Sequence, residues 1–268
     1  MQAMIRKELK DNRRNLLIWL GVMLGIIAIG AAEYSLVVME AGEEIMELFQ
    51  SLPRIFAIFF GAESESIPIS TPIGYYIMMY LWYCIVAFTH AAVLGATIIS
   101  KEERNRTAEF TFTKPFPRKE IITSKIIAAI VNVVIMTLTA LIGNFIMLAP
   151  QMANGNVSSE ILKSMLAMFF IQILFLFLGL LSSALFSSYS KALSVSAAFV
   201  GLSYFLMVLI ELMETIDYLS VLTPFMYFRG ETLVQDGFSL FYTAITTSVI
   251  LIAGYLTFFR YKKRDLHS

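Results

Sequence analysis

The stretch IIAAIVNVVIMTLTALIGNFIML, residues 126–148, contains no Asp, Glu, Lys or Arg. A helix crosses the hydrocarbon core of a bilayer with about 20 mostly apolar residues. A helix that is apolar on every side needs either the core of a large protein or a bilayer around it. The rest of the chain decides between these two environments.

The composition of the whole chain is that of a membrane protein. Of its 268 residues, 58% are hydrophobic and only 15% are charged, and the mean hydropathy is +0.74. Long stretches lack charged residues, and no internal repeat or low-complexity tract divides the chain. We expect an all-α polytopic membrane protein with a single transmembrane domain over residues 1–268. Its six expected spans are residues 15–38, 73–100, 121–148, 164–187, 191–212 and 238–260.

The basic residues predict the orientation of these spans. Lys and Arg collect in short cytoplasmic loops, and six spans place both termini on the same side of the membrane. If both termini are cytoplasmic, only Arg54, Lys163 and Arg229 of the 20 Lys and Arg residues fall outside the cytoplasmic segments. We therefore expect cytoplasmic termini, with the loop between the second and third spans on the same side.

Segments outside the spans have patterns of their own. Residues 4–15 place Ile5 and Leu9 one turn apart among basic residues, which suits either a short amphipathic interfacial helix or a disordered basic tail. On the outer side we expect loop helices that rest on the membrane surface or partly re-enter it. These expected extracellular helices lie within residues 41–50, 54–60 and 218–228.

The chain lacks the motifs of several enzyme classes. No glycine is followed by lysine, so the phosphate-binding loop Gly-x-x-x-x-Gly-Lys is missing, and so are Gly-x-Ser-x-Gly and His-Glu-x-x-His. The single cysteine, Cys84, excludes an internal disulfide framework and a cysteine-rich zinc site. A net charge of zero gives no sign of a nucleic-acid partner. We expect no catalytic residue, no metal and no cofactor bound by this chain.

Few ionisable groups lie within the expected spans, which also contain intramembrane asparagines. His90, Asn132 and Asn144 either line a translocation path or bridge helices structurally, and the structural role is the one we favour. Glu33 and Glu211 lie near outer ends of spans. This scarcity of carboxylates argues against an ion-coupled secondary carrier.

The loop KEERNRTAEFTFTKPFPRKE, residues 101–120, is unusually polar for this chain. Ser100 and Glu103 fit the capping box Ser-x-x-Glu, which predicts that a new short helix begins here. That helix should end before Pro115, and Pro117 suits the first turn of the third span. The loop is either an ordinary solvated positive loop or a docking surface. Its mixed charge and its aromatic residues favour docking against another protein.

The same loop resembles the cytoplasmic loop of bacterial ABC-transporter permeases of the type-2, exporter-like superfamily. The pattern in that family is roughly Glu-x-x-x-Gly-Thr-x-Glu, then a Pro, then an Arg and a Lys that open the next span. Arg106 replaces the usual Gly, and Phe116-Pro117 replaces an aliphatic residue and a Ser. The resemblance continues in LSVLTPFMYF, residues 219–228, and in RYKKRDL, residues 260–266. The matching loop residues are Glu103, Thr107, Glu109, Pro115, Arg118 and Lys125.

This resemblance implies a permease subunit in the bacterial plasma membrane that works with a separate cytosolic ABC ATPase, which binds ATP and Mg²⁺. A second permease copy or a paralogue completes the transporter, and export of an amphipathic or hydrophobic substrate is the implied activity. The alternatives are a membrane anchor or sensor without transport and, less favoured, a secondary carrier. The loop between the second and third spans is then a coupling helix that docks on the ATPase. Its implied docking residues are Glu102, Glu103, Arg104, Arg106, Thr107, Glu109, Phe110 and Phe112, with Pro115, Arg118 and Lys125 at the junction with the third span.

Overall fold

The fold is taken from a computed structural model of the chain. Side chains are not described at 101–104, 118, 151–152 and 262–263. The residues that the structure describes are 1–35, 44, 47, 51, 53–62, 66–104, 117–152, 157–186, 188–213 and 215–263.

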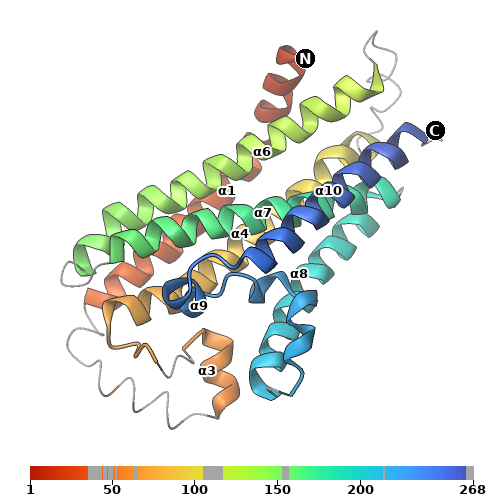
Figure 1. Cartoon of the computed structure of the whole chain (residues 1–268). Coiled ribbons are helices and arrows are strands. Elements are labelled where there is room, and N and C mark those ends of the chain that lie inside the picture. Colours follow the sequence, from red (N-terminus) through yellow and green to blue (C-terminus); the bar gives the residue numbers. More distant parts are fainter. Residues whose placement is uncertain are drawn as a thin grey trace.

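Within this described part, six helices are long and apolar enough to cross a membrane, and no strand occurs. Figure 1 shows them packed alongside one another in an elongated bundle. The prediction of an all-α protein with six spans is confirmed. The helices are α1 (Gln2–Glu33), α4 (Pro72–Arg104), α6 (Arg118–Gly143), α7 (Val157–Leu185), α8 (Tyr189–Met213) and α10 (Leu240–Lys263).

Short elements connect these helices. The start of α1 and the end of α10 lie toward one end of the bundle, whereas α3 and α9 lie toward the other (Figure 1). The expected loop helix at 54–60 matches α3, and the expected segment 218–228 contains two 3₁₀ turns, η4 and η5. That these elements face the outside stays a prediction. The short elements are α3 (Arg54–Phe60), the π-helical η2 (Asn144–Leu148), the 3₁₀ turns η3 (Ala149–Met152), η4 (Asp217–Leu222) and η5 (Pro224–Met226), and α9 (Gly230–Gln235).

The centre of the bundle is the pair α4 and α7. In the most apolar window of each helix, 72% of α4 and 61% of α7 is buried, against 22% for α1 and α10. Gly95 and Gly179 lie where the two helices cross, and an added Cβ on either would collide with backbone of the other helix. Small residues allow helices in a bilayer to approach closely. The outer helices thus leave much of their apolar surface to lipid or to another chain.

The N-terminal segment differs from both alternatives expected for residues 4–15. It is helical, so it is not a disordered tail, and it belongs to the same unbroken helix α1 as the first span. No proline or glycine precedes Gly21, and the segment is rich in good helix formers such as Leu, Arg, Lys and Glu. Nothing in the sequence therefore ends a separate interfacial helix before the span begins.

The capping-box prediction at Ser100 is wrong. Ser100 lies inside α4, fully buried, and its hydroxyl donates to the carbonyl oxygen of Ala96 at 2.6 Å. Because α4 continues to Arg104 without a break, the backbone N–H groups after Ser100 belong to a helix interior and need no cap. A serine in a helix interior commonly bonds the carbonyl four residues back. Pro117 does stand at the start of the third span, as the residue just before α6.

Candidate functional site

The structure does not describe residues 105–116, and the described residues of the predicted docking set lie before and after them. Glu102, Glu103 and Arg104 form the last turn of α4, and Arg118 opens α6. The shape of the predicted coupling helix, and its docking role, stay a prediction. The residues of that prediction that lie outside the described part of the chain are Arg106, Thr107, Glu109, Phe110, Phe112 and Pro115.

Lys125 is the described residue of this set with the most informative surroundings. Its side chain is 1% exposed, and its Nζ lies 3.1 Å from Oε1 of Glu8. The same ammonium donates to the carbonyl oxygen of Ile98 at 2.9 Å. A single buried cation therefore joins α6 to α1 and to α4.

The position of this ion pair matters as much as its burial. Lys125 lies about two turns after the start of α6, and Ile98 lies less than two turns before the end of α4. The pair thus ties α1, α4 and α6 together within about two turns of the end of α4 and of the start of α6.

Of the two residues in this ion pair, the sequence indicated only Lys125. The family pattern pointed to Lys125, but nothing pointed to Glu8, which stands between basic residues in a segment expected to lie at the interface. The signal in the sequence is weak, because Glu8 and Asp11 are both acidic residues among the basic residues of this segment. The packing of α1 along α6 brings Glu8 to Lys125, and the sequence alone does not predict that packing.

The polar residues within the spans have structural partners. The side-chain amide of Asn132 donates to the carbonyl oxygen of Ala128 at 2.7 Å, and that of Asn144 donates to Ala140 at 2.9 Å. The ring of His90 is buried and lies 5.8 Å from the ring of Trp19, centroid to centroid. Both amide bonds go to the carbonyl four residues back along the same stretch of helix, whereas the contact of His90 with Trp19 joins α4 to α1. Only His90 therefore bridges two helices among these contacts, and the role of the two asparagines stays a prediction.

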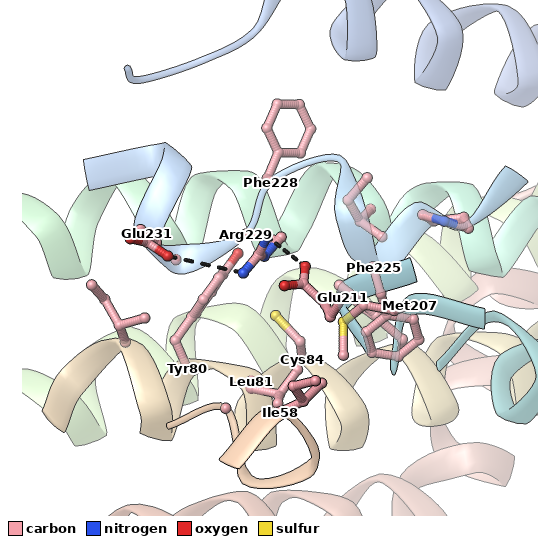
Figure 2. A pocket seen from close by; sticks show the side chains of 16 residues that line it. Ile58, Tyr80, Leu81, Cys84, Met207, Glu211, Phe225, Phe228, Arg229 and Glu231 are labelled. Atoms are coloured by element: carbon pink, nitrogen blue, oxygen red, sulfur yellow. Dashed lines mark ion pairs between the residues drawn. The ribbon is translucent and has the colours of Figure 1, made fainter. Parts of the chain in front are cut away.

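A pocket, drawn in Figure 2, is lined by residues of α3 and α9, which lie toward the end of the bundle opposite the start of α1 and the end of α10 (Figure 1). It lies between α3, α4, α7 and α8 and is bordered by η5 and α9. Its empty volume is about 710 Å³, counting the open space at its mouth. Its apolar lining includes Ile58, Leu81, Cys84, Met207, Phe225 and Phe228.

Three charged side chains stand together in this pocket. Figure 2 shows Arg229 between the carboxylates of Glu211 and Glu231. One guanidinium nitrogen lies 2.5 Å from Oε1 of Glu211, and the other lies 3.9 Å from Oε2 of Glu231. Ser66 donates to Oε1 of Glu231 at 2.5 Å and accepts from the amide of Gln235 at 2.7 Å. The network connects α8, α9 and the segment before α4.

Gly230 allows α9 to begin directly over α4. A Cβ at Gly230 would lie 2.8 Å from Cγ2 of Ile77, closer than side chains tolerate. Deeper in the pocket, Phe225 packs against Phe88 at 5.1 Å and against Phe175 at 6.0 Å, centroid to centroid. Aromatic pairs at these distances add to the energy of simple apolar burial. The pocket thus has an aromatic floor and a charged rim.

A comparison with known protein families decides the class of this bundle. The family model described as "ABC-2 family transporter protein" matches residues 2–266. The chain belongs to the ABC-2 transporter family. A search of curated proteins finds no match.

Membership in the ABC-2 family gives the six-helix bundle its general role. The chain is a multi-pass membrane protein and the transmembrane component of an ABC transporter. Subunits of this kind are generally not catalytic themselves, and the family implies association with a cytosolic ABC ATPase. The resemblance drawn from the loop at 101–120 is confirmed.

Proposed function

We propose that this ABC-2 permease exports an amphipathic or hydrophobic substrate, driven by a separate cytosolic ATPase. The ATPase, and not this chain, binds ATP and Mg²⁺. The permease lies in the bacterial plasma membrane with both termini cytoplasmic and pairs with a second copy or a paralogue. The observation that carries the proposal is the family match across residues 2–266, together with the six apolar helices.

The docking surface proposed for the ATPase is the segment Glu102–Phe112. Three features of the chain support this choice. The segment begins in the last turn of α4 and continues toward α6, it carries both acidic and basic residues, and it includes Phe110 and Phe112. Complementary charges orient a partner, and aromatic residues anchor it. The buried pair of Lys125 and Glu8 beside this segment would pass a movement of the ATPase into the bundle.

The test of this proposal is a double charge reversal, Glu103→Lys with Glu109→Lys. If the segment docks on the ATPase, the reversal replaces attraction with repulsion and ATP-driven transport falls at least tenfold, a loss of about 1.4 kcal/mol in coupling. The measurement is ATP-dependent substrate movement in vesicles that contain both subunits, with co-purification of the ATPase as a second readout.

The matched control reverses two other glutamates, Glu44 and Glu47, whose side chains are exposed. This variant carries the same change in charge, and we expect it to keep transport and co-purification. Unchanged transport in the Glu103 and Glu109 variant would exclude the docking surface. If the unaltered permease and its ATPase together move no substrate, the protein is a membrane anchor or sensor instead.

A further inference from the structure

The charges that line the pocket near α9 do not balance. Among the described lining residues, the charged ones are Glu211, Arg229 and Glu231, so the formal charge of this set is negative by one unit. Arg229 lies 2.5 Å from Glu211 but 3.9 Å from Glu231. The arginine therefore lies closer to Glu211, and Glu231 also accepts a hydrogen bond from the neutral hydroxyl of Ser66 at 2.5 Å. The three charged side chains together keep one unit of formal negative charge at the rim of the pocket.

These carboxylates lie in partly dry surroundings. The side chain of Glu211 is 11% exposed and that of Glu231 is 21% exposed. Charges interact more strongly where water is scarce, because the effective dielectric constant is lower than in bulk water. A cation that enters the pocket is consequently attracted more strongly than it would be on an open surface.

The remainder of the pocket suits an apolar body. Phe88 and Phe225 present aromatic rings, and Met207 adds a flexible side chain that adapts to different shapes. Aromatic faces also attract cations, so the apolar wall and the acidic rim favour the same ligand. Ile58 and Leu81 complete the apolar side of the pocket.

Other ligand types fit these surroundings less well. An anionic group would compete with two carboxylates for Arg229, which already contacts both. A wholly apolar ligand would cover the charged rim without pairing with it, and desolvating a charge in this way is unfavourable. A neutral polar group would not neutralise the excess negative charge of the pocket.

We propose that this pocket binds a monocationic amphiphile, with its apolar body against Phe225 and Phe88 and its cationic group at Glu231 and Glu211. That the ligand is also the transported substrate rests on the proposed function. The binding itself does not, since it requires neither the ATPase nor transport.

The first test uses three probes with the same dansyl fluorophore and the same alkyl chain. The first, monodansylcadaverine, ends in an ammonium, and the other two end in a hydroxyl and a carboxylate. Binding to the purified, full-length permease in neutral nanodiscs is followed by dansyl fluorescence. We expect the ammonium probe to bind about three- to tenfold more tightly than the hydroxyl probe, the range of one partly screened ion pair. The carboxylate probe should bind most weakly.

The second test is the substitution Glu231→Gln, which removes one negative charge and keeps the size of the side chain. The ammonium and hydroxyl probes should then bind equally. Glu160→Gln is the matched control, because Glu160 pairs with Lys163 on α7 and does not line the pocket. It should preserve the preference for ammonium. Phe225→Leu should weaken all three probes by a similar factor, since it alters only the apolar wall.

Two results would overturn the proposal: equal binding of the three probes to the unaltered protein, or a preference for the carboxylate. The probe series needs no variant, so misfolding of Glu231→Gln would not prevent a decision. Selective ammonium binding without ATP-driven transport would retain the pocket and remove the exporter function. ATP-driven transport without selective ammonium binding would retain the exporter function and exclude the pocket as a site for cationic amphiphiles.

Discussion

The ammonium of Lys125 and the carboxylate of Glu8 share a site that is almost closed to solvent, with side-chain exposures of 1% and 6%. Such a pair does not by itself make a protein more stable, because desolvation of both ions offsets their attraction. Removal of one ion is costly, however, since the other stays buried. The value of the pair therefore lies in holding three helices in one arrangement.

The substitution Lys125→Met should destabilise the folded permease by about 3–5 kcal/mol, because Glu8 loses the lysine charge. The double variant Lys125→Met with Glu8→Met should recover most of this loss, since no buried ion is left behind. Thermal unfolding in detergent, followed by tryptophan fluorescence, measures both.

The control for this prediction is Lys119→Met, which changes an exposed lysine at the start of the same helix. Its stability should stay within about 0.5 kcal/mol of the original protein. If the double variant is no more stable than Lys125→Met alone, the ion pair is not the cause of the loss.

At the scale of elements, the crossing of α4 and α7 holds the bundle together. Gly95 and Gly179 leave no room for a methyl group at this crossing. Ser100 shows a related limit of local motifs. Its capping-box pattern was present in the sequence, yet the apolar residues before it continue α4 past that point. A capping motif has a meaning only where a helix begins, and tertiary packing decided that this one does not.

The substitution Gly95→Ala should push α4 and α7 apart, because the new methyl group meets the backbone of Leu176 and not a movable side chain. Overpacking of this kind costs about 1–3 kcal/mol. The measurement is the yield of monodisperse protein in size-exclusion chromatography, together with its unfolding temperature.

Gly201→Ala is the matched control, since an added methyl group on that glycine of α8 meets no described atom within 4 Å. It should be neutral or slightly stabilising, because alanine favours a helix more than glycine does. Equal losses in both variants would mean that close approach of α4 and α7 is not what Gly95 provides.

At the scale of the whole molecule, the two ends of the bundle differ in character. One end has the start of α1, the end of α10 and the buried pair that joins α1 to α6. The other has α3, α9 and the acidic pocket (Figure 1). The orientation predicted from the basic residues places the first end in the cytoplasm.

This orientation predicts the labelling of introduced cysteines in intact cells. With Cys84 replaced by serine, Asp236→Cys should react with a membrane-impermeant maleimide added from outside. Lys7→Cys should react only after the cells are permeabilised. Both positions are exposed in the structure, so accessibility does not bias the comparison. The opposite labelling pattern would reverse the topology.

The six spans, the expected orientation and the resemblance to ABC permeases all follow from the amino-acid sequence. Hydropathy and loop motifs are properties of continuous segments, so they can be read without knowing how the chain packs. Which charges meet depends instead on how the helices pack. Lys125 and Glu8 are 117 residues apart in the chain, and Arg229 reaches Glu211 only because the segment between α8 and α9 folds back over α4. The energy of an ion pair depends on distance and burial, and neither quantity is a property of a single segment.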